Sequence, residues 1–395
     1  MSALAPEVGR RAIPQPVLVA LSECLSSPFK DVRKQAAATI QVAATRNELP
    51  RAVIDALGRA LGDDCEEVRS YATFALEIAS RDTRKGVRRD AAAAVLAAAR
   101  TGELPVELLD AMGVALKDAH KNVRSTAAAA ISEAASRSEF TKDIIQALGV
   151  ALGDADRDVR VGAAGALAAA LREADVSIRL CAVEAIIMAS SQAVPEVLLE
   201  ALAASLRDSH MVMRAAGAAA LALAAERSAL PTYALHALGV ALGDVDVEAV
   251  ILEDSEERVG ASEVRQQAAN ALFIAASGQQ LPAEVVERLA AALRDEDGEV
   301  RSIAASALEE VAKGAELARE VIEVLAEALE DEDQEVRAIA ARILGTLAAA
   351  PGEALEDKEA GLAARAPSDD ALEEAASESS ARAAKRAGAR TRRGD

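Results

Sequence analysis

Hydrophobic residues between Thr141 and Leu171 recur with the spacing of two short α-helices. The first set falls at positions i, i+4, i+7 and i+8 and consists of Ile144, Leu148, Ala151 and Leu152. The second set consists of Val159, Ala163, Ala166, Leu167 and Ala170. The intervening segment, Gly153–Asp156, predicts a turn. Two helices of about a dozen residues cannot enclose a core alone, but stacked copies of such a hairpin can. The pattern therefore predicts an all-α fold, a right-handed α-solenoid of stacked hairpins.

A dipeptide of an apolar residue followed by arginine marks the first turn of each predicted second helix. These arginines are Arg33, Arg69, Arg88, Arg124, Arg160, Arg179, Arg214, Arg265, Arg301 and Arg337. Most successive spacings are 35 or 36 residues, which suits a helical hairpin. We expect the repeats to occupy residues 17–350, after a flexible lead at residues 1–16 that holds three prolines.

Two of the spacings are only 19 residues and leave room for a single helix. These lone helices are predicted at Lys85–Arg100 and Asp175–Ser191. If successive helices remain antiparallel, each lone helix exchanges the two faces of the stack. The hairpins between residues 104 and 170 should then be inverted relative to the others.

An acidic residue stands six positions before nearly every one of these arginines. The resulting pairs are Asp63 and Arg69, Asp82 and Arg88, Asp118 and Arg124, Asp154 and Arg160, Glu173 and Arg179, Asp208 and Arg214, Asp295 and Arg301, and Asp331 and Arg337. The acid falls in the interhelix turn, and the arginine lies about one turn into the second helix. Neighbouring copies could therefore form a continuous series of ion pairs, the Asp–Arg ladder. Because the spacing recurs in every layer, we interpret the ladder as structural rather than as a ligand site.

The motif D-x5-R with V-R-x2-A-x2-A-L, as in Asp154 to Leu167, resembles the HEAT repeat, and most closely its phycobilin-lyase-like form in bacteria and archaea. The resemblance covers residues 17–350. It implies that the acid and the arginine are scaffold residues and that the second helices line the concave face. It also leaves open an accessory role in a cofactor-modifying enzyme such as a phycobilin lyase, although no residue identifies a bilin site.

Composition limits the possible chemistry. The chain is 51% apolar but only 2% aromatic, and its net charge of −20 opposes nonspecific binding to nucleic acid. The three cysteines have no metal-ligand spacing. None of the three histidines is followed by a glutamate, whereas the HEAT-like hydroxylases bind iron through repeated His-Glu pairs. No signal peptide, membrane span or enzyme motif is evident, so we expect a soluble cytoplasmic protein without catalytic residues, metal or cofactor.

Two charged segments depart from the repeat. The first is an acidic insertion at about residues 246–261, which lengthens one spacing to 51 residues and contains Asp246, Glu248, Glu253, Asp254, Glu256 and Glu257. The second is the segment 351–395, expected to be mostly disordered and basic at its end, with Arg382, Lys385, Arg386, Arg390, Arg392 and Arg393. Both are candidate docking elements for a protein partner.

The sequence thus predicts a scaffold or adaptor that binds a protein partner along its concave face, and the acidic insertion would suit a partner with a basic segment. The alternative from another class is the accessory subunit of a bilin lyase or similar enzyme. A third interpretation is a regulatory module that docks through the insertion or the basic end.

Overall fold

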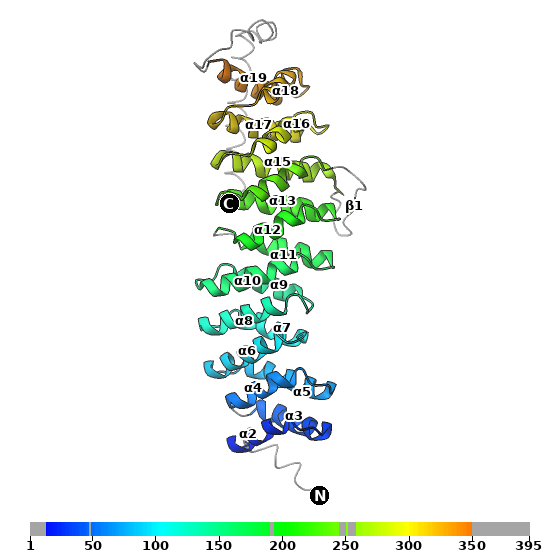
Figure 1. Ribbon diagram of the computed structural model, residues 1–395, viewed down its shortest axis with the longest axis vertical. Coiled ribbons are helices and arrows are strands. Elements are labelled where there is room, and N and C mark those ends of the chain that lie inside the picture. Colours follow the sequence, from blue (N-terminus) through cyan, green and yellow to red (C-terminus); the bar gives the residue numbers. More distant parts are fainter. Residues whose placement is uncertain (1–12, 47–48, 190–192, 245–249, 252–257, 350–395) are drawn as a thin grey trace, which may run out of the picture. The chain divides into compact units, whose positions relative to one another are not determined.

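The computed structural model describes residues 13–46, 49–189, 193–244, 250–251 and 258–349. The chain divides into two compact units, Met1–Ala201 and Leu202–Asp395. Both consist of short antiparallel helices stacked side by side (Figure 1).

The first unit contains ten described helices. They are α2 (Gln15–Cys24), α3 (Lys30–Ala44), α4 (Arg51–Ala60), α5 (Glu66–Ser80), α6 (Lys85–Ala99), α7 (Val106–Ala115), α8 (Lys121–Ala134), α9 (Lys142–Ala151), α10 (Arg157–Ala170) and α11 (Val176–Met188). The predicted lone helices correspond to α6 and α11. Residues 190–191 of the second prediction lie outside the described part.

The boundary between the units falls within α12 (Glu196–Ser205). The second unit continues with α13 (Met211–Ala225), α14 (Thr232–Ala241), α15 (Ala261–Gly278), α16 (Ala283–Ala292), α17 (Gly298–Gly314), α18 (Arg319–Glu327), the 3₁₀ turn η1 (Ala328–Glu330) and α19 (Gln334–Ala349). Between α14 and α15, β1 (Val250–Ile251) pairs with β2 (Arg258–Val259) in antiparallel register. The predicted fold class, an all-α solenoid, is confirmed, and its right-handed sense stays a prediction.

Local sequence explains where the helices begin. Pro50, Pro105, Pro231 and Pro282 each occupy the position just before the first residue of a ten-residue helix, with φ near −60°. Proline fits there because its fixed φ suits the entry into a helix. Asp156 caps α10 differently, since its carboxylate accepts a hydrogen bond from the backbone N–H of Asp158.

The core of each unit is built from aliphatic and alanine side chains. Leu57, Leu76, Ile131 and Leu148 are fully buried in the first unit, and Leu238, Leu272 and Leu308 are fully buried in the second. Small residues allow the helices to approach closely. A Cβ atom added to Gly58 would lie 3.0 Å from the Cβ of Ala94, and one added to Gly149 would lie 2.9 Å from the Cβ of Ala185. These two contacts join α4 to α6 and α9 to α11, so each lone helix packs against a glycine of the preceding first helix.

The lone helix α6 exchanges the two layers of the first unit. One layer contains α2, α4, α6, α8 and α10, and the other contains α3, α5, α7, α9 and α11, with neighbouring members in contact. The second helices α3 and α5 therefore lie in one layer, whereas the second helices α8 and α10 lie in the other. The predicted inversion of the hairpins between residues 104 and 170 is confirmed within this unit. In the second unit, α13, α15, α17 and α19 stack together, and α14, α16 and α18 form the facing layer.

Candidate functional site

The Asp–Arg ladder joins six Arg-bearing helices among the described residues to the next hairpin of their layer. Arg124 on α8 is representative: its Nε donates to Asp154 Oδ2 at 2.6 Å and its Nη2 donates to Asp154 Oδ1 at 3.0 Å. Both side chains are largely buried, with 17% and 12% of their surfaces exposed. A paired guanidinium and carboxylate in this geometry form one of the stronger polar contacts available to a protein.

The same pairing recurs at a sequence separation of 30 residues. In the first unit the pairs are Arg33 with Asp63, Arg88 with Asp118, and Arg124 with Asp154. In the second unit they are Arg214 with Asp244, Arg265 with Asp295, and Arg301 with Asp331. The Nε to Oδ2 distances lie between 2.5 and 2.9 Å.

Each arginine also binds the turn that precedes its own helix. Arg160 Nη1 donates to the carbonyl oxygen of Asp154 at 2.8 Å. Equivalent bonds to the residue six positions earlier are made by Arg33, Arg69, Arg88, Arg124, Arg179, Arg214, Arg301 and Arg337. The spacing of six residues thus reflects a bond to a backbone carbonyl, whereas the ion pair involves the following hairpin.

The ladder carboxylates also organise the helix starts. Asp154 Oδ1 accepts a hydrogen bond from the backbone N–H of Asp156 at 2.8 Å. The same bond to the residue two positions on is made by Asp63, Asp82, Asp118, Asp208, Asp295 and Asp331. One carboxyl group, as at Asp154, therefore contacts both the arginine of the preceding hairpin and the backbone at the start of the next helix.

The prediction of a continuous ladder is wrong. Among the described residues, Arg69 and Arg160 bond to backbone carbonyls but form no ion pair. The reason is the layer exchange: α5 is followed in its layer by α7, a first helix, which presents no ladder acid to Arg69. Asp82, at the start of α6, pairs instead with its neighbour Arg84 at 2.8 Å.

The second lone helix begins differently. Glu173 contributes its backbone carbonyl, which accepts from Arg179 Nη1 at 2.7 Å. Asp175, rather than Glu173, caps α11 by accepting from the N–H of Ser177 at 2.8 Å. In the last described hairpin, Arg337 Nη1 donates to the carbonyl oxygens of Asp331 and Glu332.

Three ladder residues do not belong to an acid and arginine pair spaced six residues apart. Arg33 follows Ser27 at that spacing, and Asp244 and Arg265 are separated by the acidic insertion. Arg265 Nη1 nevertheless donates to the carbonyl oxygen of Asp244 at 2.9 Å, as the other arginines do to theirs. The bond from the arginine to the turn carbonyl is therefore kept across the insertion. A count of 30 residues forward from each arginine would have found Asp63, Asp244 and Asp295.

Ion pairing shifts the pKa values of Arg124 and Asp154. The hydrogen bond from Arg124 is the main cause that lowers the pKa of Asp154, against the opposing effect of burial. The same bond raises the pKa of Arg124. Pairing with Arg124 thus favours the ionised form of Asp154, as a structural role requires.

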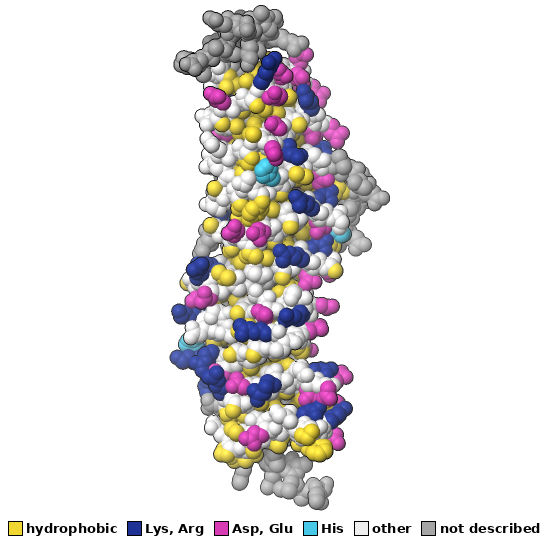
Figure 2. Space-filling view, viewed as in Figure 1, with side chains coloured by type: hydrophobic (Ala, Val, Ile, Leu, Met, Phe, Trp, Pro, Cys, Tyr) yellow, Lys and Arg dark blue, Asp and Glu magenta, His cyan; other side chains and the backbone are white. Residues whose placement is uncertain are grey.

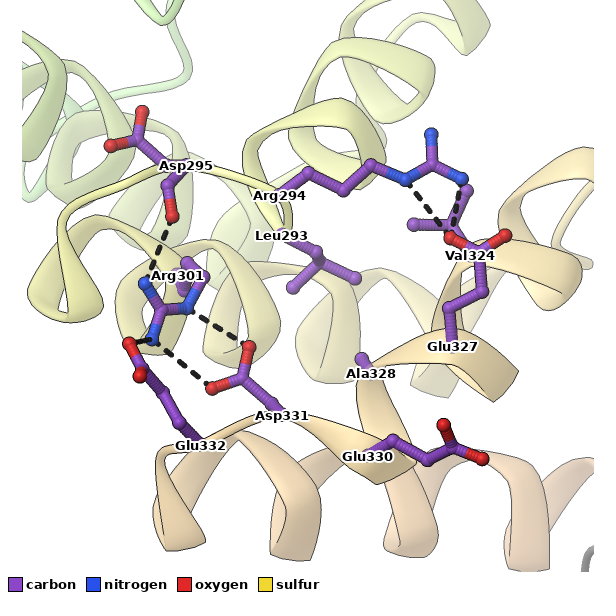
Figure 3. A pocket seen from close by; sticks show the side chains of 10 residues that line it. All are labelled: Leu293, Arg294, Asp295, Arg301, Val324, Glu327, Ala328, Glu330, Asp331 and Glu332. Atoms are coloured by element: carbon purple, nitrogen blue, oxygen red, sulfur yellow. Dashed lines mark hydrogen bonds and ion pairs between the residues drawn. The ribbon is translucent and has the colours of Figure 1, made fainter.

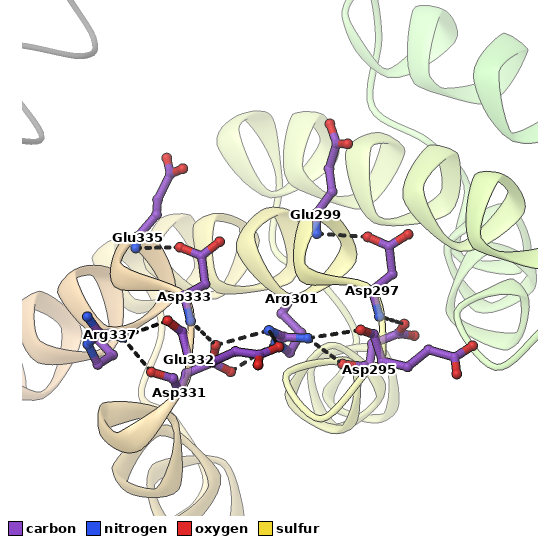
Figure 4. Close-up of polar contacts among 10 residues, drawn as sticks. Asp295, Asp297, Glu299, Arg301, Asp331, Glu332, Asp333, Glu335 and Arg337 are labelled. Carbon is purple, nitrogen blue, oxygen red and sulfur yellow. Dashed lines mark hydrogen bonds and ion pairs between the residues drawn. The ribbon is translucent and has the colours of Figure 1, made fainter.

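Acidic side chains are frequent in the last two described interhelix turns. Figure 4 shows Arg301 between these turns, bonded to the carbonyl of Asp295, to both carboxylate oxygens of Asp331, and to Glu332 at 2.9 Å. Asp297 and Asp333 are occupied differently, since each accepts from the backbone N–H two residues on. The carboxylates in these turns outnumber the cations that they contact.

A groove of about 410 Å³ lies beside these turns in the second unit. Its apolar floor includes Leu293, Val324 and Ala328, which come from the ends of α16 and α18 (Figure 3). On one side is the cluster around Arg301, and on the other Arg294 Nη2 donates to Glu327 at 2.6 Å.

A larger recess of about 850 Å³ lies in the first unit, mainly along α7 and α9. Val114 and Val150 line it and are 56% and 68% exposed. Its charged lining is balanced, with Arg81, Arg88 and Lys117 against Asp110, Asp118 and Asp143. Exposed hydrophobic side chains lie among charged ones on the face shown in Figure 2.

The two charged segments singled out from the sequence fall mostly outside the described residues. This applies to Asp246, Glu248, Glu253, Asp254, Glu256 and Glu257 and to Arg382, Lys385, Arg386, Arg390, Arg392 and Arg393. The predicted insertion ends one residue too late, because Ala261 is the buried first residue of α15.

Two further findings concern the described residues alone. No group of three or more His, Cys, Asp or Glu side chains in this part of the chain could hold a metal ion. No helix within it is long and apolar enough to cross a membrane.

Stacked helical hairpins joined by a repeated ion pair define an α-helical repeat protein. The family model for HEAT repeats matches residues 251–345 and 286–389, and these matches support a HEAT-repeat protein. No curated protein matches the chain. These comparisons give no evidence for a particular kinship with the phycobilin-lyase-like repeats.

Proposed function

We propose that the protein is a non-enzymatic interaction scaffold that binds a protein partner through exposed side chains on the first helices of each unit. HEAT repeats commonly serve as protein-interaction scaffolds, which agrees with the family match. A frame of repeated hairpins suits this role because it presents an extended surface that is ordered before binding.

The observation that carries the proposal is one exposed position in the last turn of successive first helices. It is Val114 in α7 and Val150 in α9 in the first unit, and Val240, Ala291 and Glu327 in the second. The neighbouring ladder and core residues repeat from hairpin to hairpin, whereas this position changes from apolar to acidic among these five helices and is the exposed Arg59 in α4. A constant frame with a varied exposed position supports recognition of a specific partner.

The recess beside Val114 and Val150 offers an apolar contact in the first unit. Exposed valines over a recess of about 850 Å³ give a partner side chain both a floor and walls. Apolar contacts of this kind supply most of the affinity in protein interfaces, and a charged rim contributes mainly to specificity.

The test starts with capture of partners from the native cell extract, followed by reconstitution with the purified partner. We expect the double variant Val114→Glu/Val150→Glu to weaken binding by at least about tenfold, which corresponds to about 1.4 kcal/mol. The matched control is Val161→Glu on α10, where the valine is 57% exposed and lies in the other layer. Full affinity of the double variant would refute the proposed contact in the first unit.

The acidic insertion and the basic end of the chain are secondary docking elements in this proposal. The insertion interrupts the turn between α14 and α15 without altering the contact between Asp244 and Arg265. Loops carried on a rigid frame often hold binding residues.

A further inference from the structure

The groove between α16 and α18 has a distinct charge pattern. Its floor is apolar, with Leu293 and Ala328 nearly buried at 3% and 6% exposure. Figure 3 shows the two charged clusters on opposite sides of this floor. A ligand that fills the groove must therefore place an apolar group on the floor and polar or charged groups on both sides of it.

Both arginines of the groove are already neutralised. Arg301 contacts Asp331 and Glu332, and Arg294 contacts Glu327. The lining residues are Leu293, Arg294, Asp295, Arg301, Val324, Glu327, Ala328, Glu330, Asp331 and Glu332. These residues carry five carboxylates and two guanidinium groups, and the carboxylate of Asp295 is paired with Arg265. Five negative charges against three positive charges leave a net charge of −2.

The excess carboxylates are accessible to a ligand. Glu332 is 84% exposed and Glu327 is 58% exposed. Glu330 is also exposed and makes no polar contact with any described residue. These carboxylates can accept hydrogen bonds from a cationic side chain without leaving a buried group unpaired.

We propose that this groove binds a basic peptide segment of a partner protein, in which an apolar side chain is flanked by lysine or arginine. The apolar side chain packs on Leu293, Val324 and Ala328. The flanking cations lie against Glu332 on one side and against Glu327 and Glu330 on the other. The inference rests on the proposed interaction function and specifies the chemistry of the partner.

Size and charge both support this occupant. A volume of about 410 Å³ falls within the range of roughly 300 to 1,000 Å³ that is usual for ligand sites. The recess of the first unit has balanced charge and so provides an internal contrast. An acidic or phosphorylated segment would face repulsion, because no cation of the groove lacks a carboxylate partner.

The test uses the full chain and a labelled heptapeptide with glycine at each end and one leucine between two pairs of lysines. Binding is measured by fluorescence anisotropy at low and physiological salt, and hydrogen exchange locates the protected segments. We expect protection at residues 293–301 and 324–332 and a weaker affinity at the higher salt concentration. Peptides with serine in place of leucine, or glutamate in place of lysine, should bind at least about fivefold more weakly, a loss of about 1 kcal/mol.

A charge-matched pair of variants separates the groove from the net charge of the protein. The variant Glu327→Gln/Glu330→Gln/Glu332→Gln should weaken peptide binding at least about fivefold, or about 1 kcal/mol. The variant Glu316→Gln/Glu320→Gln/Glu323→Gln removes the same charge from exposed residues of the same hairpin but outside the groove lining, and should bind normally.

Three outcomes would overturn the inference: no binding of the lysine–leucine peptide at low salt, equal losses in the two triple variants, or binding that appears only after removal of residues 368–395. The last result would show that the chain's own basic end fills the groove. None of these outcomes affects the test of Val114 and Val150, which lie in the other unit.

Discussion

Arg124 and Asp154 are joined by two hydrogen bonds of 2.6 and 3.0 Å across neighbouring hairpins. Arg160, one repeat further on, makes only carbonyl bonds to Asp154 and Ala155 among the described residues. The two arginines occupy the same position of the repeat, so they form a natural comparison between the ion pair and the turn contact.

We predict that Arg124→Ala destabilises the first unit by about 1 to 3 kcal/mol, because it leaves the largely buried Asp154 without its cation. Arg160→Ala should lower stability by only about 0.5 to 1.5 kcal/mol, since it removes hydrogen bonds to carbonyl groups and leaves no carboxylate unpaired. Hydrogen exchange of α8 to α10, together with urea unfolding followed by circular dichroism, measures both effects. Equal losses would show that the ion pair adds nothing beyond the turn contact.

The same pair makes stability depend on pH. Pairing with Arg124 lowers the pKa of Asp154 in the folded chain, so its contribution is fully present above the ordinary aspartate pKa of about 4. This contribution is lost as the pH falls through the lower, folded pKa. We therefore expect the stability difference between the native chain and Arg124→Ala to shrink from pH 7 to pH 3. A difference that stays constant over this range would argue against an ionic contribution.

Glu67 should add an acid-sensitive contact between α3 and α5. Hydrogen bonds from the thiol of Cys65 and from Lys34 lower its pKa to about 2. Its contribution is present above the ordinary glutamate pKa and is lost as the pH falls toward 2. We predict that Glu67→Gln reduces the hydrogen-exchange protection of α3 and α5 at pH 7 but has little effect on it near pH 2. An equal effect at both pH values would contradict the assignment.

The layers and the exchange at α6 could be predicted because helix length, period and antiparallel succession leave few arrangements for a stack. The partners in the ladder could not be read from the six-residue spacing alone. That spacing records the bond from Arg160 to a carbonyl, which is local in sequence. The carboxylate belongs to the next hairpin, and the layer exchange decides whether it is present.

The groove between α16 and α18 cannot be predicted from the sequence, for a different reason. Its shape depends on where α18 ends and the 3₁₀ turn η1 begins, and helix ends shift by a residue or two without a clear sequence signal. The acidic character of Glu330 and Glu332 was visible in the sequence. Their position beside Leu293 depends on the packing of two hairpins.

The glycines that contact the lone helices should be intolerant of larger residues. A Cβ at Gly149 would lie 2.9 Å from the Cβ of Ala185 and 3.2 Å from its carbonyl oxygen. We predict that Gly149→Ala lowers stability by about 1 to 3 kcal/mol through overpacking between α9 and α11. Gly113→Ala is the control, because its Cβ would meet Ile144 at 3.7 Å, an ordinary contact. The control should be neutral or stabilising, since alanine favours helix more than glycine does. Similar effects of the two substitutions in thermal unfolding would refute the role of close packing.

Removal of residues 245–259 should restore a regular hairpin between α14 and α15. Arg265 then follows Asp244 by six positions, the spacing found for Arg160 and Asp154. Because Arg265 already bonds to the Asp244 carbonyl at 2.9 Å, the two ends of the deleted segment lie close enough to be joined. We expect stability to change by less than about 1 kcal/mol, since closing a surface loop of this length has only a small entropic effect. Circular dichroism melting and hydrogen exchange of α15 provide the measurement.

Deletion of 245–261 is the contrasting variant, because it also removes Ala261, which is buried at the start of α15, and it should lower stability further. If the shorter deletion already abolished the protection of α15, the insertion would have to contribute to the frame, and its role as an added docking element would be wrong.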